Sequence, residues 1–228
     1  MTLRLACLLA PGPKTVEHAL LAESLGYDRV WLADSPALWQ DIWVRMALVA
    51  EHTHRIQLGT AVLIPSLRHV VTQAAAIATI ADIAPGRLTV GLATGFTGRA
   101  ALGQRKRLPW AFVKRYVQQL RSLLHGEQVE VDGALCQLIP STGFMPQRPI
   151  TVPLFLAASG PRGYWVPPYL RPSGACLTLG TRIPDGLVTL SRVTPHRGCA
   201  SSHARWQLSV LCVPAGSILQ SYAVRGTC

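Results

Sequence analysis

The chain of 228 residues is long enough for one domain with a sizeable core. Apolar residues make up 49% of it and charged residues only 14%, which excludes an intrinsically disordered chain. The net charge of +11 comes from scattered arginines with one short cluster, Arg105-Lys106-Arg107, and not from a basic stripe with interleaved aromatic residues. A basic nucleic-acid-binding protein therefore stays a weak alternative.

Strands and helices alternate through the first 162 residues. Short apolar runs rich in β-branched residues predict strands, and apolar positions three and four apart predict helices. We expect strands at 3–9, 29–33, 56–64, 88–93 and 152–157, helices at 15–25, 42–54, 70–83 and 110–124, and a β-hairpin at 128–132 and 135–139. Strands separated by helices of this length imply βαβ units and a parallel sheet buried on both faces.

This alternation is lost after residue 162. Residues 163–228 hold four of the six cysteines, six arginines, no lysine and one acidic residue, Asp185. Three apolar stretches, 175–179, 187–190 and 208–213, are expected to be strands. We therefore expect a regular β/α part at 1–162 and an atypical Arg-, Pro- and Cys-rich tail at 163–228. The change in composition suggests a shifted reading frame or a degraded gene end.

Cellular context is predicted from what the sequence lacks. No apolar run reaches the roughly 20 residues of a membrane-spanning helix, and the first run ends at Pro11, too early for a signal peptide. We expect a cytoplasmic protein without disulfides that contacts neither a membrane nor nucleic acid. His196, Cys199 and His203 have metal-like spacing but no fourth ligand, so no metal site is expected.

Candidate site residues follow from the parallel sheet, because functional groups of β/α folds lie on the loops after the strands. That rule selects Asp34 after the second strand, Ala61-Val62 at the end of the third, Thr94-Gly95 after the fourth and Ser159-Gly160 after the fifth. Each has an ordinary structural explanation as well. An aspartate in such a place often caps the next helix, and a glycine-bearing loop is often a simple turn.

Three segments resemble a known family in their order and spacing: LGTAVLIPSLRH (58–69), GRLTVGLATGFTGRAALGQ (86–104) and FLAASGP (155–161). They are similar to the bacterial luciferase-like superfamily of flavin- and coenzyme F420-dependent oxidoreductases. The nearest branch is that of methylenetetrahydromethanopterin reductase, which uses the deazaflavin coenzyme F420. The resemblance covers residues 3–162. It implies an α/β fold of the (β/α)8 TIM-barrel type, incomplete here because five strands are recognisable, followed by an irregular tail.

The resemblance implies an enzyme that uses coenzyme F420 or FMN for hydride transfer or monooxygenation of a small organic substrate. It implies that Asp34 binds the cofactor ring, that a non-prolyl cis peptide at Ala61-Val62 supports the ring from behind, and that Thr94-Gly95 lies beside it. Ser159-Gly160 would bind the cofactor phosphate. No catalytic residue is assigned, because Ser35 stands where the family's sugar-phosphate branch has a histidine.

Several alternatives stay open. Arg68 and His69 invite a catalytic interpretation, but packing at the start of a helix explains them at least as well. The chain is also interpretable as a non-catalytic, truncated remnant of such an enzyme. Five parallel strands leave two open edges and an exposed apolar face, which predicts low solubility unless tail strands cover part of them. A homodimer is left open too.

Overall fold

The structure is a computed structural model that describes residues 4–95, 97–106, 108–157, 177–180, 190–193 and 207–211. In chain order its elements are β1 (Arg4–Leu9), α1 (Thr15–Ser24), β2 (Arg29–Leu32), α2 (Ile42–His52), β3 (Gln57–Leu63), the 3-10 helix η1 (Pro65–Leu67), α3 (Val70–Ile83), β4 (Leu88–Leu92), α4 (Thr97–Ala101), α5 (Trp110–His125), β5 (Val129–Val131), β6 (Ala134–Cys136), β7 (Leu154–Leu156), β8 (Leu177–Gly180), β9 (Leu190–Val193) and β10 (Gln207–Leu211). Every element predicted before residue 162 is present, with bounds that differ by a few residues. The residues of η1 and α4 were expected to belong to the loops after the third and fourth strands.

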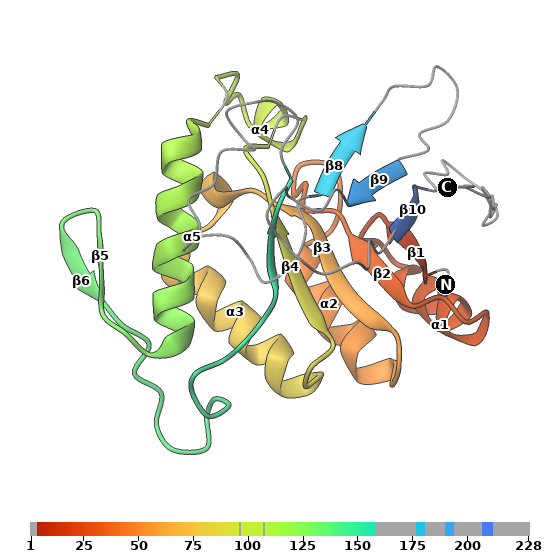
Figure 1. Cartoon of the computed structure of the whole chain (residues 1–228), viewed down its shortest axis with the longest axis horizontal. Helices are drawn as coiled ribbons and strands as arrows, with labels where there is room; N and C mark the ends of the chain where they lie inside the picture. The colour runs from red at the N-terminus through yellow and green to blue at the C-terminus, as the bar shows by residue number, and fades with distance from the viewer. Residues whose placement is uncertain are drawn as a thin grey trace, which may run out of the picture.

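Six strands form one parallel sheet in the order β10-β1-β2-β3-β4-β7. Helices α1, α2, α3 and α5 lie along one side of it (Figure 1). The last residues of neighbouring strands are in register, as the pairs Leu9–Leu32 and Leu92–Leu156 show. This arrangement confirms the predicted α/β fold with a parallel sheet, and it brings the loops after β1, β2, β3, β4 and β7 to one edge.

The tail contributes a strand to this sheet. Strand β10, expected at 208–213, pairs in parallel with β1 and covers an edge that five strands would have left open. Strands β8 and β9 form a separate antiparallel ribbon. Of the stretch 187–190, only Leu190 is described, and it is the first residue of β9; residues 187–189 lie outside the described residues. A division of the chain at residue 162 stays a prediction, because that position lies outside the described residues.

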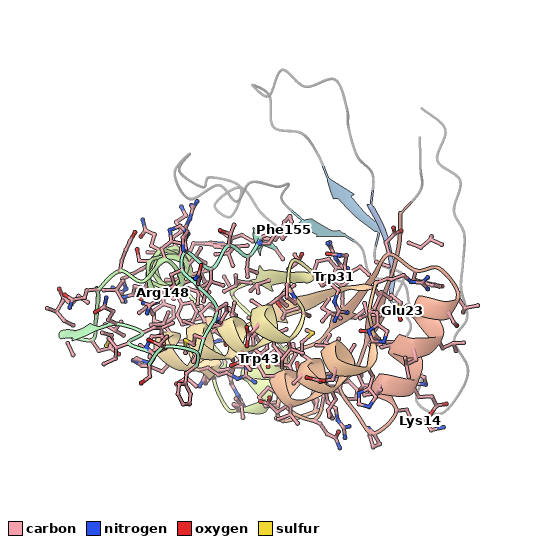
Figure 2. The ribbon with its side chains drawn as sticks, turned by 90° about the horizontal axis from the view of Figure 1, so that it is seen from below. Lys14, Glu23, Trp31, Trp43, Arg148 and Phe155 are labelled. Atoms are coloured by element: carbon pink, nitrogen blue, oxygen red, sulfur yellow. The ribbon has the colours of Figure 1, made fainter. Side chains whose placement is uncertain are left out.

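The two faces of the sheet carry different apolar clusters. The larger cluster packs between the sheet and the helices and includes the fully buried Met46, Ile77 and Leu120. A smaller one on the other face joins Trp31 and Ala6 to Leu8, Ala61 and Phe155. Figure 2 shows Trp31 and Phe155 on the side of the sheet away from the helices, with Trp43 on the helical side. The smaller cluster therefore lines the face of the sheet away from the helices.

Close packing of that lining depends on Gly59. It pairs in register with Trp31, and a Cβ atom at Gly59 would lie 2.2 Å from the nearest carbon of the indole ring. Gly59→Ala should therefore lower the free energy of unfolding by about 1–3 kcal/mol, as overpacking does elsewhere. Urea denaturation measures the change. In the control Gly12→Ala the new Cβ has no atom closer than 3.9 Å, and equal stability of the two variants would contradict the prediction.

Glu23, in the last turn of α1, holds the loop between α2 and β3. Its Oε1 accepts hydrogen bonds from the backbone N–H groups of His54, Arg55 and Ile56, at 3.0, 2.7 and 2.8 Å. Burial raises the pKa of Glu23, but these three hydrogen bonds and the charge of Arg55 lower it further than burial raises it. The folded protein therefore favours the ionised form of this carboxyl group.

The pH dependence of stability should report this contact. Because the pKa of Glu23 is lower in the folded than in the unfolded chain, its stabilisation is complete above the unfolded value of about 4.3 and is lost as the pH falls through the folded value. Glu23→Gln should be less stable than the natural chain by only about 0.5–1 kcal/mol at neutral pH, since Glu23 is half-buried and solvent screens its charge. Urea denaturation should show the two proteins converging on acidification, and a pH-independent gap would count against the assignment.

Candidate cofactor site

Asp34 lies two residues beyond the end of β2 and is buried, with a side chain that is 1% exposed. Its Oδ2 accepts a hydrogen bond from Nη1 of Arg68 at 2.7 Å. Its Oδ1 is buried and accepts no hydrogen bond from the part of the chain that the structure describes. Burial raises the pKa of Asp34; the hydrogen bond and charge of Arg68 and the backbone N–H group of Ile64 lower it, but by less than burial raises it. One buried carboxylate oxygen is thus left for a donor from elsewhere.

The next helix is capped by a different aspartate. Oδ1 of Asp41 accepts hydrogen bonds from the backbone N–H groups of Trp43 and Val44, at 2.8 and 3.2 Å, at the start of α2. Asp34 therefore does not serve as a helix cap here, which removes its ordinary structural explanation.

Arg68, between η1 and α3, joins these two aspartates. Its Nη2 donates to Oδ2 of Asp41 at 2.8 Å, and its backbone oxygen accepts a hydrogen bond from the Tyr116 hydroxyl at 3.1 Å. Burial raises the pKa of Tyr116, so its hydroxyl remains a donor at neutral pH. His69 caps α3 by accepting a hydrogen bond from the Val71 N–H group. The interpretation of these residues as packing at a helix start is thus correct for His69. It is incomplete for Arg68, because the sequence did not reveal its partners.

Ala61 and Val62 lie within β3, at an irregularity of the sheet. The peptide bond between them is cis, as expected, and the register between β3 and β4 shifts between Thr60 and Leu63. Oγ1 of Thr60 accepts a hydrogen bond from the Gly91 N–H group at 2.9 Å and donates one to the Gly91 oxygen at 3.0 Å. Ala61 packs against the lining cluster that contains Trp31. This segment therefore lies on the face of the sheet away from the helices, close to the ends of the strands.

Thr94 and Gly95, both half-buried, lie in the loop after β4, and Gly95 packs against Ile64 in the loop after β3. Gly95 has a φ of +69°, and a Cβ atom there would lie 2.7 Å from Cγ2 of Ile64. At Gly98 a Cβ atom would lie 3.1 Å from Cδ1 of Ile64 and 3.2 Å from Oγ of Ser35. The loops after β2, β3 and β4 therefore meet, which brings Asp34 near the glycine-bearing loop.

Arg99 of α4 fastens this loop, and the sequence did not predict that role. Its side chain is buried; Nη1 donates to Oγ of Ser66 and, at 2.7 Å, to Oε1 of Gln104, while Nη2 donates to the Lys106 oxygen at 2.9 Å. Together these bonds hold α4 and the residues after it against η1. The sequence signal that could have indicated such a clamp is an arginine between small residues, Gly98 and Ala100, shortly after a strand.

The other residues considered from the sequence lie outside the described residues, and the main cleft lies away from this edge. Ser159 and Gly160 are outside the described residues, as are His196, Cys199 and His203. A cleft of about 790 Å³ lies between η1, α5 and the β5–β6 hairpin; its lining includes Arg68 but none of the predicted cofactor-binding residues. Within the described ranges no cluster of His, Cys, Asp or Glu could hold a metal ion, and no helix is long and apolar enough to cross a membrane.

Comparison with known proteins agrees with this fold. The model of the luciferase-like monooxygenase family matches residues 9–166. The chain belongs to this family. It is 35% identical over 167 residues to an F420-dependent glucose-6-phosphate dehydrogenase of Kineococcus radiotolerans, covering 67% of this chain and 48% of that protein. It is 30% identical over 153 residues to a 5,10-methylenetetrahydromethanopterin reductase of Methanolobus tindarius, covering 67% and 46%.

Solved structures show the same fold. The coenzyme F420-dependent tetrahydromethanopterin reductase of Methanopyrus kandleri superposes with a TM-score of 0.57 at 21% identity, over 70% of this chain and 51% of that one. Such neighbours are TIM barrels, so this luciferase-like chain has part of a TIM-barrel fold. The chain spans about half the length of the curated relatives it matches.

Proposed function

We propose that this luciferase-like chain carries the cofactor-binding part of a coenzyme F420-dependent oxidoreductase that transfers hydride to or from a small organic substrate. The observation that carries the proposal is the unpaired, buried Oδ1 of Asp34 at the carboxyl edge of a parallel sheet. Buried polar atoms are almost always hydrogen-bonded, so this oxygen is suited to a donor that arrives with a ligand. The names of the relatives favour coenzyme F420 over FMN.

The residues present fit a flat ring system at this edge. At Ala61 the face of the sheet away from the helices is apolar and continuous with Trp31, which suits the face of a ring. Asp34 offers an acceptor for a ring N–H group. When bound, the deazaflavin would supply the centre that takes or gives hydride. The role of this chain would be to bind and orient the cofactor and to keep water away from it. In the proposal, Thr94 and Gly95 form the side of the site next to β4, and Ser159-Gly160 bind the cofactor phosphate.

The substrate of the proposed enzyme need not be that of its relatives. Ser35 stands beside Asp34 at the position where the sugar-phosphate branch has a histidine. A serine hydroxyl does not gain or lose a proton near neutral pH as an imidazole does. We therefore propose a small organic substrate other than a sugar phosphate, with any required proton supplied by another residue.

A binding experiment tests the cofactor assignment. The full chain is titrated separately with coenzyme F420 and with FMN, and the fluorescence of each cofactor is followed. We expect a micromolar or lower Kd for coenzyme F420 and weaker binding of FMN. Tighter binding of FMN would contradict the F420 assignment and favour monooxygenation. Binding of neither cofactor would overturn the proposed function and favour the non-catalytic alternative.

A further inference from the structure

Arg68 connects the candidate site to two helices. Its side chain bridges Asp34 and Asp41 through two different nitrogens, at 2.7 and 2.8 Å, and is 14% exposed. Its backbone oxygen is held by Tyr116 of α5, while Asp41 caps α2. Both ends of the residue are thus fixed by elements outside the sheet. A planar guanidinium donates from several nitrogens in fixed directions, which suits such a bridge, whereas a lysine ammonium has a single nitrogen.

We propose that Arg68 is a positioning residue of the cofactor site: it fixes Asp34 through Oδ2 and leaves Oδ1 to accept a hydrogen bond from the cofactor ring. This inference rests on the function proposed above. The carboxyl group of Asp34 can rotate freely only if the bond to Arg68 breaks. Because that bond is charge-assisted and buried, it holds the carboxylate plane in one orientation.

The charge of Arg68 also favours the ionised form of Asp34, against burial. Among the described residues, the charged or titratable groups that face Asp34 are Arg68, Asp41 at the start of α2 and Tyr116 of α5. Burial and the charge of Asp41 both favour the protonated form of Asp34, and Arg68 is the cation that opposes them. Without Arg68, Asp34 would more readily become a neutral acid, whose proton competes with the ring N–H group.

The inference is tested first without any cofactor. The pKa of Asp34 is measured by NMR in protein labelled with carbon-13 at the aspartate carboxyl, with Asp34→Asn used to assign its signal. In Arg68→Met we expect the pKa of Asp34 to rise by about 1 pH unit or more. Arg68→Lys should restore part of this difference, because it returns the charge without the bridge. Asp28→Asn, at the opposite end of β2 from Asp34, should keep the pKa of Asp34 unchanged.

Cofactor affinity is the second readout, with coenzyme F420 titrated against each variant across pH. We expect Arg68→Met to bind at least about 10-fold more weakly at neutral pH, with Arg68→Lys in between. If Arg68→Met does not fold, comparing Arg68→Lys with the natural chain tests in the same way whether Arg68 positions Asp34. An unchanged pKa of Asp34, or equal affinity in all variants, would overturn the inference. Failure of the natural chain to bind any cofactor would instead overturn the proposed function, and the NMR result would still report on Arg68.

Discussion

Replacing Thr60 by valine is expected to lower the free energy of unfolding by about 2–4 kcal/mol. Thr60 is fully buried, and its hydroxyl forms hydrogen bonds with both the N–H group and the oxygen of Gly91. The register between β3 and β4 shifts beyond Thr60, so the side chain takes the place of a strand partner there. Valine has nearly the same shape but leaves both backbone groups of Gly91 buried without a partner.

Urea denaturation of Thr60→Val and Thr60→Ser separates the hydroxyl from the methyl group. Thr60→Ser keeps both hydrogen bonds and should lose only about 1 kcal/mol for one buried methyl. The prediction fails if the valine variant is as stable as the serine variant. The variant also matters for the site, because Thr60 immediately precedes the cis peptide bond between Ala61 and Val62.

Asp34→Asn is expected to weaken binding of coenzyme F420 by about 10- to 100-fold, the value of a hydrogen bond to a charged group. The substitution keeps the size of the side chain but removes the negative charge that faces both Arg68 and the proposed ring N–H group. It acts at a residue with no role in capping α2, since Asp41 has that role.

Asp28→Asn is the matched control for this experiment. Asp28 lies just before β2, at the opposite end of the strand from Asp34, and its Oδ2 accepts a hydrogen bond from the Leu5 N–H group at 2.7 Å. Fluorescence titration of coenzyme F420 should therefore give the natural affinity for Asp28→Asn. Equal affinity of the two variants would contradict a direct role for Asp34, whichever cofactor the natural chain prefers.

Prediction from sequence worked where the signal is local. Apolar periodicity gave the first four strands and the helices between them, and the parallel arrangement then placed Asp34, Ala61-Val62 and Thr94-Gly95 at one edge. Short elements with weak periodicity were missed, as α4 shows. In the tail the apolar stretches predicted strands but not their pairing, because a parallel partner distant in sequence leaves no local signal. The pairing of β10 with β1 appears only in the folded chain.

By itself, the sequence of this luciferase-like chain determined the order of its elements, the parallel sheet and the strand-end loops that form the candidate site. These depend on residue periodicity and on the direction of the strands. Only the tertiary structure decided which polar groups meet: Arg68 with Asp34, 34 residues away, and Tyr116 with Arg68, 48 residues away. The physical reason is that such pairs depend on the packing of α2, α3 and α5 around the sheet, which positions side chains to within a hydrogen-bond length.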